Sequence, residues 1–360
     1  MGKVLMKGNE AIGEAAIRAG CLNYFGYPIT PQSEVAEYLA RRMPEVGGMF
    51  LQGESEVAVS YMIYGAAGAG ERVFTTSSSP GISLMGEGIS YCAGAECPSV
   101  FVNIMRGGPG LGGILPSQAD YLQATKGMGH GDFRLLVMAP ASVQEAVEMV
   151  MAAFPLAEKY RGPIMILGDG LIGQMMEPVE FPEDLKSEPA NKDAWATNGM
   201  GHRKSSTRNL IRSMILDPEQ LNAHNLALKA KYEQMAREEV RCEPYNLDGD
   251  YRILLVSYGT MSRVCRTAVD QLKEKGVEVG LLRPQTLFPF PAKAITEAAS
   301  KESCKAVLSV EMSMGQMLED VERAVMGRRP VSWYGKCGGE VPTPEEVIDA
   351  IERLDKAVTH

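Results

Sequence analysis

The chain has 360 residues, of which 45% are hydrophobic and 22% charged, and its formal net charge is −9. This is the composition of a globular protein, and the length favours two domains over one. The acidic balance argues against a nucleic-acid partner, and the apolar runs are too short to span a membrane. Since the first residues, MGKVLMKGNE, show no secretory signal, we expect a cytoplasmic protein.

Residues 1–182 alternate between helix and strand signals. Such alternation predicts an α/β domain in which helices cover both faces of a parallel sheet. The predicted helices are 9–18 with Asn9 as its cap, 31–42, 54–70, one opening at Pro80 behind a Ser79 cap, one from about Gln118, and 142–158. The predicted strands are 22–29, 48–52, 73–76, 98–105, 135–138 and 163–167.

The stretch GYPITPQSE, residues 26–34, joins the first of these strands to the next helix. Pro31 suits the first position of a helix, because its missing N–H would be unbonded there. Thr30 can accept a hydrogen bond from the first turn and is therefore the expected cap. A hydroxyl beside free N–H groups at a helix start can also bind an anion. The spacing alone leaves both the plain cap and the anion site open.

The remaining residues divide into a polar segment and a second alternating region. Residues 183–250 are predicted to be a linker and a surface helical arm, which starts with Asp217 as its cap and can pack on a partner. Residues 251–360 predict a second, smaller α/β domain. Its expected strands are 253–258, 277–282, 306–310 and 331–334, and its expected helices are 260–276, 291–301, 315–326 and one from Thr343.

Two glycine motifs follow buried strands. GPGLGG, Gly108–Gly113, fits the dinucleotide pattern G-x-G-x-x-G, but Leu115-Pro116 interrupts before any helix, so a flexible or substrate-facing loop is favoured. The second motif is GDG, Gly168–Gly170. Thiamine diphosphate enzymes bind Mg²⁺ with Gly-Asp-Gly and a downstream Asn, and Asp169 with Asn198 would supply suitable oxygens. The stretch between them lacks the required helix-then-strand pattern, which favours a plain turn in which Asp169 is solvated or caps a helix.

Charged residues stand at two other strand or helix ends. Glu54 and Glu56, in GESE, start a helix, where carboxylates either complement the helix dipole or face a ligand. Arg106 ends a core strand just before the glycine loop, at the edge where an open α/β sheet binds ligands. The alternative for Arg106 is a surface ion pair. The seven cysteines contain no Cys-x-x-Cys pair, so neither a zinc site nor an iron–sulfur cluster is expected on this chain.

Together these residues resemble one family. The stretches YPITP, ESE, TTSSSPGISLM, NIMRGGPG, PSQADYLQATKGMGHGDFR and LRPQTLFPFP are similar to the alpha subunit of the 2-oxoacid:ferredoxin oxidoreductases. The segment from RGGPG to GHGD is most similar to the branched-chain type, the 2-oxoisovalerate (3-methyl-2-oxobutanoate) enzyme. The resemblance spans nearly the whole chain, although LRPQTLFPFP is shared more widely with transketolase-like C-terminal domains.

The resemblance implies a fold. Residues 1–182 would form a thiamine diphosphate-binding domain of the pyrimidine type, built on a parallel sheet. Residues 183–250 would form a linker and helical arm, and residues 251–360 a smaller, transketolase C-terminal-like α/β domain.

The resemblance also implies roles for residues. The glutamate that contacts the pyrimidine N1′ falls on Glu56, and not on Glu54, because the family spacing to the following glycine lands on Gly65. The residues that bind the substrate fall on Thr30 and Arg106.

Two residues of YPITP, Pro28 and Ile29, would contact the cofactor. Among these positions, Glu56, Thr30 and Arg106 would carry the chemistry.

The partners come from the same resemblance. A beta subunit would supply the diphosphate and Mg²⁺ half of the site, which weighs against the Asp169 and Asn198 interpretation. Gamma and ferredoxin-like delta subunits are further expected partners. The [4Fe–4S] clusters would sit on other subunits, and coenzyme A and ferredoxin would take the acyl group and the electrons. The expected reaction converts 3-methyl-2-oxobutanoate to acyl-CoA, CO₂ and reduced ferredoxin. The alternatives are a 2-oxoglutarate:ferredoxin oxidoreductase alpha subunit, a non-redox transketolase-type subunit, and a non-catalytic assembly subunit.

Overall fold

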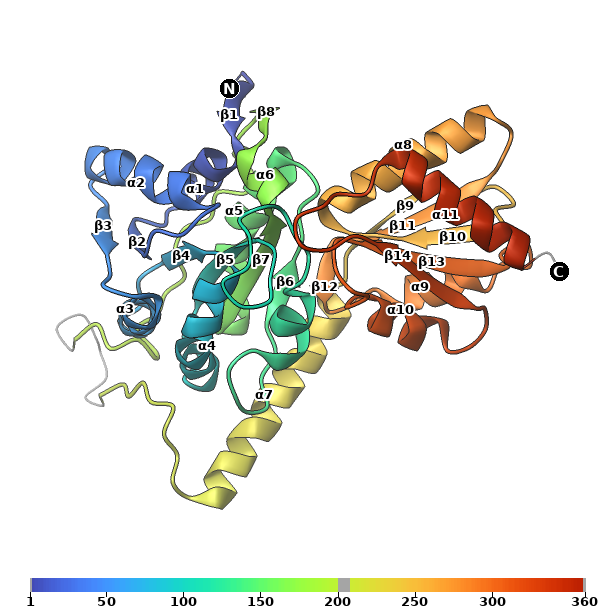
Figure 1. Cartoon of the computed structure of the whole chain (residues 1–360). Helices are drawn as coiled ribbons and strands as arrows, with labels where there is room; N and C mark the ends of the chain where they lie inside the picture. Colours follow the sequence, from blue (N-terminus) through green and yellow to red (C-terminus); the bar gives the residue numbers. More distant parts are fainter. Residues whose placement is uncertain (1, 200–207, 359–360) are drawn as a thin grey trace.

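Two α/β units lie side by side in the structure, a computed structural model that describes residues 2–199 and 208–358 (Figure 1). The N-terminal unit is built on a seven-stranded sheet and the C-terminal unit on a five-stranded sheet. No helix in the described part of the chain is long and apolar enough to cross a membrane.

The seven-stranded sheet has the order β12-β6-β7-β5-β4-β2-β3, and all its pairs are parallel except β12 with β6. Its central strands β4, β5 and β7 are buried throughout, as expected of parallel strands covered on both faces. The strand bounds are β2 Asn23–Gly26, β3 Met49–Gln52, β4 Val73–Ser77, β5 Ser99–Met105, β6 Leu136–Met138, β7 Pro163–Asp169 and β12 Thr286–Phe288.

Helices cover the two faces of this sheet. On one face pack α1 (Gly8–Arg18), α2 (Ser33–Glu45) and α5 (Val143–Tyr160), and on the other pack α3 (Glu56–Gly68) and α4 (Ser79–Gly94). The core beneath α3 and α4 continues into the C-terminal unit. Beside α1, the antiparallel pair β1 (Val4–Lys7) and β8 (Met176–Val179) and the short α6 (Gly170–Gln174) complete the unit.

The C-terminal sheet has the order β14-β13-β10-β11-β9, and only β9 runs antiparallel to its neighbour. Its strands are β9 Cys242–Tyr245, β10 Ile253–Val256, β11 Val279–Pro284, β13 Ala306–Glu311 and β14 Val331–Gly335. Its helices are α8 Gly259–Glu274, α9 Ala292–Ala299, α10 Leu318–Val325 and α11 Pro344–Ala357. The start of α11 at Thr343 is confirmed, with a capping box between Thr343 and Glu346.

Two edge strands pair outside the part of the chain in which they were expected. β9 precedes the C-terminal unit in sequence but pairs with β11 inside it. β12 lies in the second half of the chain but pairs with β6 of the N-terminal sheet. The domain boundaries at residues 182 and 250 stay predictions. β9 lies before residue 250 but pairs in the C-terminal sheet, and β12 lies after residue 250 but pairs in the N-terminal sheet.

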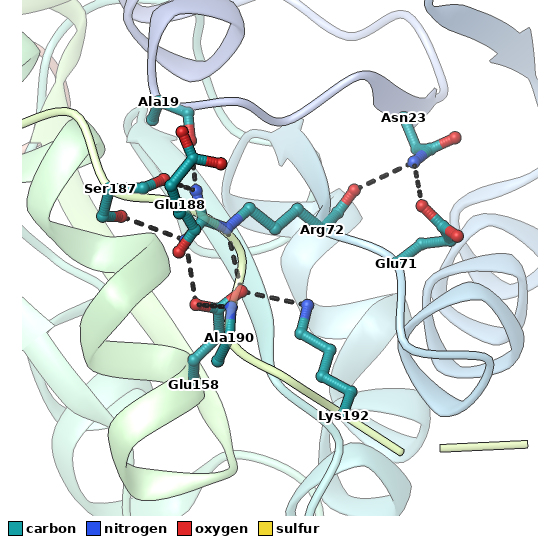
Figure 2. Close-up of polar contacts among 9 residues, drawn as sticks. All are labelled: Ala19, Asn23, Glu71, Arg72, Glu158, Ser187, Glu188, Ala190 and Lys192. Carbon is teal, nitrogen blue, oxygen red and sulfur yellow. Dashed lines mark hydrogen bonds and ion pairs between the residues drawn. The ribbon is translucent and has the colours of Figure 1, made fainter. Parts of the chain in front are cut away.

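The polar segment that joins the units is fastened to the N-terminal unit by a buried ionic cluster (Figure 2). Arg72 donates to both oxygens of Glu158 at 2.8 Å and to the Ser187 carbonyl at 2.8 Å. Lys192 reaches the same carboxylate at 2.9 Å. Burial, the largest effect, would raise the pKa of Glu158, but the hydrogen bonds from Arg72 and Lys192 hold it below its ordinary value.

The predicted arm is a helix, α7 (Pro218–Glu238), and Asp217 caps it by accepting from Gln220 N at 2.8 Å. Only Leu228 and Met235 of this helix are buried, so most of its surface faces outward.

Four predicted helix starts are wrong in detail. The helix α2 begins at Ser33, and Thr30 does not cap it, because the Pro31 carbonyl accepts hydrogen bonds from the Asn9 and Gln174 side chains and the chain makes a separate turn. The helix α1 begins at Gly8, so Asn9 lies within it and does not cap it.

The helix expected after Pro80 begins one residue earlier, with Ser78 at the cap position. The helix expected from Gln118 is reduced to a short turn that ends in a π-helical stretch, Gln123–Gly127. The residues before it are held instead by the C-terminal unit, since Gln118 N donates to the Met312 carbonyl at 2.9 Å.

Candidate functional site

The carboxyl ends of β2, β4 and β5 bring the expected site residues to one edge of the N-terminal sheet. β2 lies between β3 and β4, so the order of connection reverses there, and such a switch point is where open α/β sheets bind ligands. Thr30 follows β2, Ser77 and Ser78 stand at the end of β4, and Arg106 follows β5. Glu56, the first residue of α3, follows β3.

Glu56 is placed by a capped helix start. The Ser55 side chain accepts from Ala58 N at 3.2 Å, which fixes the first turn of α3. Glu56 is only 6% exposed, and its carboxylate has no hydrogen-bond or ion-pair partner among the described residues. A buried carboxylate without a partner is costly, so this group is a candidate to bind a ligand or a partner chain.

A glycine lets the carboxylate lie close to the neighbouring helix. A Cβ added at Gly81, in the first turn of α4, would stand 2.7 Å from Glu56 Oε1 and 2.2 Å from Ser77 Oγ. The hydroxyls of Ser77 and Ser78 are also buried, and neither has a hydrogen-bond partner within the described residues. The start of α3 therefore offers a carboxylate, and the end of β4 offers two hydroxyls, to a polar ligand.

Arg106 is 7% exposed and meets the loop that contains Thr30. One terminal nitrogen donates to the Thr30 carbonyl at 3.0 Å and the other donates to the Leu111 carbonyl at 2.9 Å. Its Nε is buried without a partner in the described chain. The structure thus brings Thr30 and Arg106 together, and the Thr30 side chain is exposed at this edge. Pro28 is exposed and Ile29 half-buried in the same turn.

The glycine loop 107–116 folds back on itself beside Arg106. Gly113 N donates to the Gly107 carbonyl at 2.9 Å, and a Cβ at Gly112, whose φ is +59°, would lie 1.9 Å from that oxygen. The loop opens no helix, unlike a dinucleotide-binding loop. It presents Leu111, Ile114 and Leu115 outward, each more than half exposed.

The Asp169 carboxylate makes its hydrogen bonds within this chain. Its Oδ1 accepts from Leu171 N at 3.0 Å, from Ile172 N at 3.2 Å and from Thr260 Oγ1 at 2.9 Å. Burial raises the pKa of this carboxyl. Asn198 instead donates to Asp193 at 3.4 Å, so the two residues do not form a joint site. Among the residues described, no group of three or more metal-ligating side chains occurs.

Several polar residues near the site were not predicted. Gln32 is fully buried, and its Oε1 accepts from Thr76 Oγ1 at 2.5 Å. Asp120 accepts from Ser79 Oγ at 2.6 Å and from Asn103 Nδ2 at 2.8 Å. The run of hydroxyls in TTSSSP, at the end of a buried strand, was the one local signal that could have indicated this network.

Two family models match the chain. The model described as "Pyruvate flavodoxin/ferredoxin oxidoreductase, thiamine diP-bdg" matches residues 14–242. The model described as "Pyruvate:ferredoxin oxidoreductase core domain II" matches residues 252–347. The predicted fold, a thiamine diphosphate-binding α/β domain followed by a second α/β domain, is therefore confirmed.

Relatives and a solved structure agree with this match. The chain is 48% identical to the ketoisovalerate oxidoreductase subunit VorB of Methanothermobacter thermautotrophicus over 98% of both chains. It is 36% identical to the 2-oxoglutarate synthase subunit KorA of the same organism, again over 98% of both. The 2-oxoglutarate:ferredoxin oxidoreductase from Magnetococcus marinus, solved with 2-oxoglutarate, coenzyme A and succinyl-CoA bound, superposes with a TM-score of 0.87 at 27% identity, over 98% of this chain and 65% of that one.

Proposed function

The chain belongs to the pyruvate flavodoxin/ferredoxin oxidoreductase family, as an alpha-type subunit of a 2-oxoacid:ferredoxin oxidoreductase, and on that premise we propose that its enzyme oxidatively decarboxylates 3-methyl-2-oxobutanoate. The products are acyl-CoA, CO₂ and reduced ferredoxin. The observation that carries the substrate is the 48% identity to a ketoisovalerate oxidoreductase subunit, against 36% to a 2-oxoglutarate synthase subunit of the same organism.

The residues around Glu56 fit the aminopyrimidine end of thiamine diphosphate. A buried carboxylate without an internal partner can hold a proton at the pyrimidine N1′, and the orphaned Ser77 and Ser78 hydroxyls can bond to a polar ligand at the same place. Gly81 leaves the space that this approach requires. When bound, thiamine diphosphate supplies the electron sink that a departing CO₂ requires. Pro28 and Ile29 would lie against the cofactor.

Arg106 and Thr30 are assigned to the oxoacid. A guanidinium has five N–H donors, and two of the Arg106 donors are engaged by main-chain carbonyls, which orient the group. The remaining donors include the buried, unpartnered Nε–H, which can bind a carboxylate by a charge-assisted hydrogen bond. The exposed Thr30 hydroxyl can donate to the same anion or to the oxygen of the keto group.

The glycine loop favours an aliphatic substrate over 2-oxoglutarate. A second substrate carboxylate would need its own cation, and residues 107–125 contain no Lys or Arg. The loop instead exposes Leu111, Ile114 and Leu115, which can contact an isopropyl group. One methylene changes such a preference by only ~10–200-fold, so related aliphatic oxoacids are expected to react as well.

The rest of the enzyme is assigned to partner subunits. A beta subunit would hold the diphosphate and Mg²⁺, which agrees with the use of Asp169 inside this chain as a helix cap. Gamma and ferredoxin-like delta subunits would complete the complex, and the [4Fe–4S] clusters would lie on subunits other than this chain. Five of the seven cysteines of this chain are buried and all are free thiols.

The test is the substrate preference of the assembled enzyme. The complex is purified without air, and kcat/KM is measured for 3-methyl-2-oxobutanoate, pyruvate and 2-oxoglutarate with ferredoxin or viologen as the acceptor. The branched-chain acid should be preferred. If 2-oxoglutarate has the highest kcat/KM, the substrate is wrong, although the class of reaction survives.

A further inference from the structure

Asp120 lies behind the candidate oxoacid site and orders the residues that lead to Arg106. Its Oδ2 accepts two hydrogen bonds, from Ser79 Oγ at 2.6 Å and from Asn103 Nδ2 at 2.8 Å. Since the Asn103 amide donates to Asp120, its oxygen is left to accept from Ser79 N, at 3.1 Å. The carboxylate therefore sets the orientation of both neighbouring side chains.

Ser79 connects Asp120 to the main chain of Arg106 by hydrogen bonds. A hydroxyl has one proton, and the short contact with the carboxylate indicates that Ser79 gives it to Asp120. The Ser79 oxygen is then free to accept from Arg106 N, which it does at 3.0 Å. This bond fixes the main chain where β5 ends and the Arg106 side chain departs. Ser79 also begins α4, whose Gly81 lies against Glu56.

The C-terminal unit holds the residues on either side of Asp120. The Gln316 side chain donates to the Ala119 carbonyl at 2.6 Å and accepts from Leu122 N at 2.9 Å. The Tyr121 hydroxyl donates to Asp320 at 2.5 Å. These contacts cross more than 190 residues of sequence and clamp the main chain around Asp120 to the second unit.

We propose that Asp120 is a positioning residue for the oxoacid site and that Gln316 of the C-terminal unit holds the main chain on either side of Asp120 in place. The inference rests on the proposed function of Arg106. Without the Asp120 carboxylate, the Ser79 proton would turn to its nearest other acceptor, the Arg106 carbonyl at 3.3 Å, and the bond from Arg106 N would weaken. The guanidinium would then no longer be held where the substrate carboxylate needs it.

The experiment uses the assembled complex with Asp120→Ala, Gln316→Ala and Arg106→Met, and with Asp132→Ala as the control at an exposed aspartate of the same segment. For Asp120→Ala and Gln316→Ala, the oxoacid KM should rise about tenfold, the size expected for one charged hydrogen bond, while kcat stays within about threefold. The thiamine diphosphate concentration for half-maximal activity should not change. Asp132→Ala should behave as the unmodified enzyme.

Two further readouts separate positioning from general damage. Hydrogen exchange at the Arg106 amide, measured without substrate, should become faster in Asp120→Ala and in Gln316→Ala. Ser79→Ala added to Asp120→Ala should cost little more than Asp120→Ala alone, because both act through one chain of bonds. If Asp120→Ala fails to assemble, Asp120→Asn, which keeps an acceptor oxygen, and Gln316→Ala decide the question.

The outcomes distinguish this inference from the function on which it rests. If Arg106→Met raises the oxoacid KM but the Asp120 and Gln316 variants do not, the positioning role is wrong and the proposed function stands. If Arg106→Met also leaves KM unchanged, the assignment of Arg106 to the oxoacid and the positioning role of Asp120 are both overturned. A fall in kcat and in assembly with unchanged KM and unchanged exchange at Arg106 would mean that Asp120 only stabilises the fold.

Discussion

Replacing Glu56 by glutamine tests the centre of the proposed site. The substitution keeps the size of the side chain but removes the charge and the ability to hold a proton at the pyrimidine N1′. Losing a hydrogen bond to a charged group costs ~1.5–3 kcal/mol, which is ~10–150-fold in rate. A side chain that also takes part in proton transfer typically contributes ~10²–10⁴-fold. The expected loss in kcat is therefore on the order of 10²–10⁴-fold.

The structure predicts that this loss comes without a loss of stability. Glu56 is 6% exposed and its carboxylate has no partner within the described chain, so glutamine breaks no internal hydrogen bond. It also removes an unpaired buried charge. The melting temperature of the complex freed of thiamine diphosphate should stay the same or rise slightly, by about 2–4 °C for each kcal/mol gained. Stability that is given up at a functional group is commonly recovered when the group is removed.

The assay is steady-state reduction of viologen by the assembled complex, with thermal unfolding measured on the same samples. Glu54→Gln is the matched control, because Glu54 lies two residues away and is exposed. It should change kcat by much less. If Glu54→Gln is the more damaging change, the assignment is off by two residues, and if Glu56→Gln keeps most of its activity, the carboxylate has no part in the chemistry.

Three other predictions concern the anion contacts, the metal content and the ionic cluster. Thr30→Val and Arg106→Met should raise the oxoacid KM more than they affect cofactor retention. Arg106→Lys should not restore the KM, because the point charge of a lysine does not replace the planar fork of a guanidinium. Unchanged KM values in Thr30→Val and Arg106→Met would contradict the assignment. The chain purified alone without air should be colourless and inactive, and stoichiometric iron with a brown colour would refute the placement of the clusters on other subunits. Arg72→Met should destabilise the chain by about 3–5 kcal/mol in denaturant unfolding, because it leaves Glu158 buried with Lys192 as its remaining cation. Since the pKa of Glu158 is lowered in the fold, its contribution is present at neutral pH and is lost as the pH falls through that lowered pKa, so the stability difference between the natural chain and Glu158→Gln should shrink in acid. A difference that is constant down to acidic pH would count against this cluster.

Local patterns were enough to bring the candidate site residues to one edge of the sheet. Arg106 stands directly after β5, Glu56 begins α3, and Thr30 lies in the turn between β2 and α2, and the parallel sheet then brings such positions to one edge. The cap at Thr30 was wrong because contacts from Asn9 and Gln174, distant in sequence, decide where α2 begins.

The supporting residues could not be predicted in this way. Asp120 and Gln316 stand 196 positions apart by their numbers, and the Gln316 bonds to Ala119 and Leu122 have no local pattern that announces them. The short strand β12 could not be expected either, since its three residues pair with a sheet formed by the first half of the chain. Such contacts depend on tertiary packing, which overrides local preference.

The pairing of β12 and β9 bears on how this protein can be divided or recombined. A gene cut between residues 250 and 251 would take β12 away from β6 and would separate β9 from β11. Each fragment would then display a row of unsatisfied main-chain donors and acceptors, which invites aggregation. A design that moves either unit into another protein must therefore include the edge strand of its sheet, β12 for the N-terminal unit and β9 for the C-terminal unit. Recombination of the two halves as independent domains during evolution would face the same obstacle.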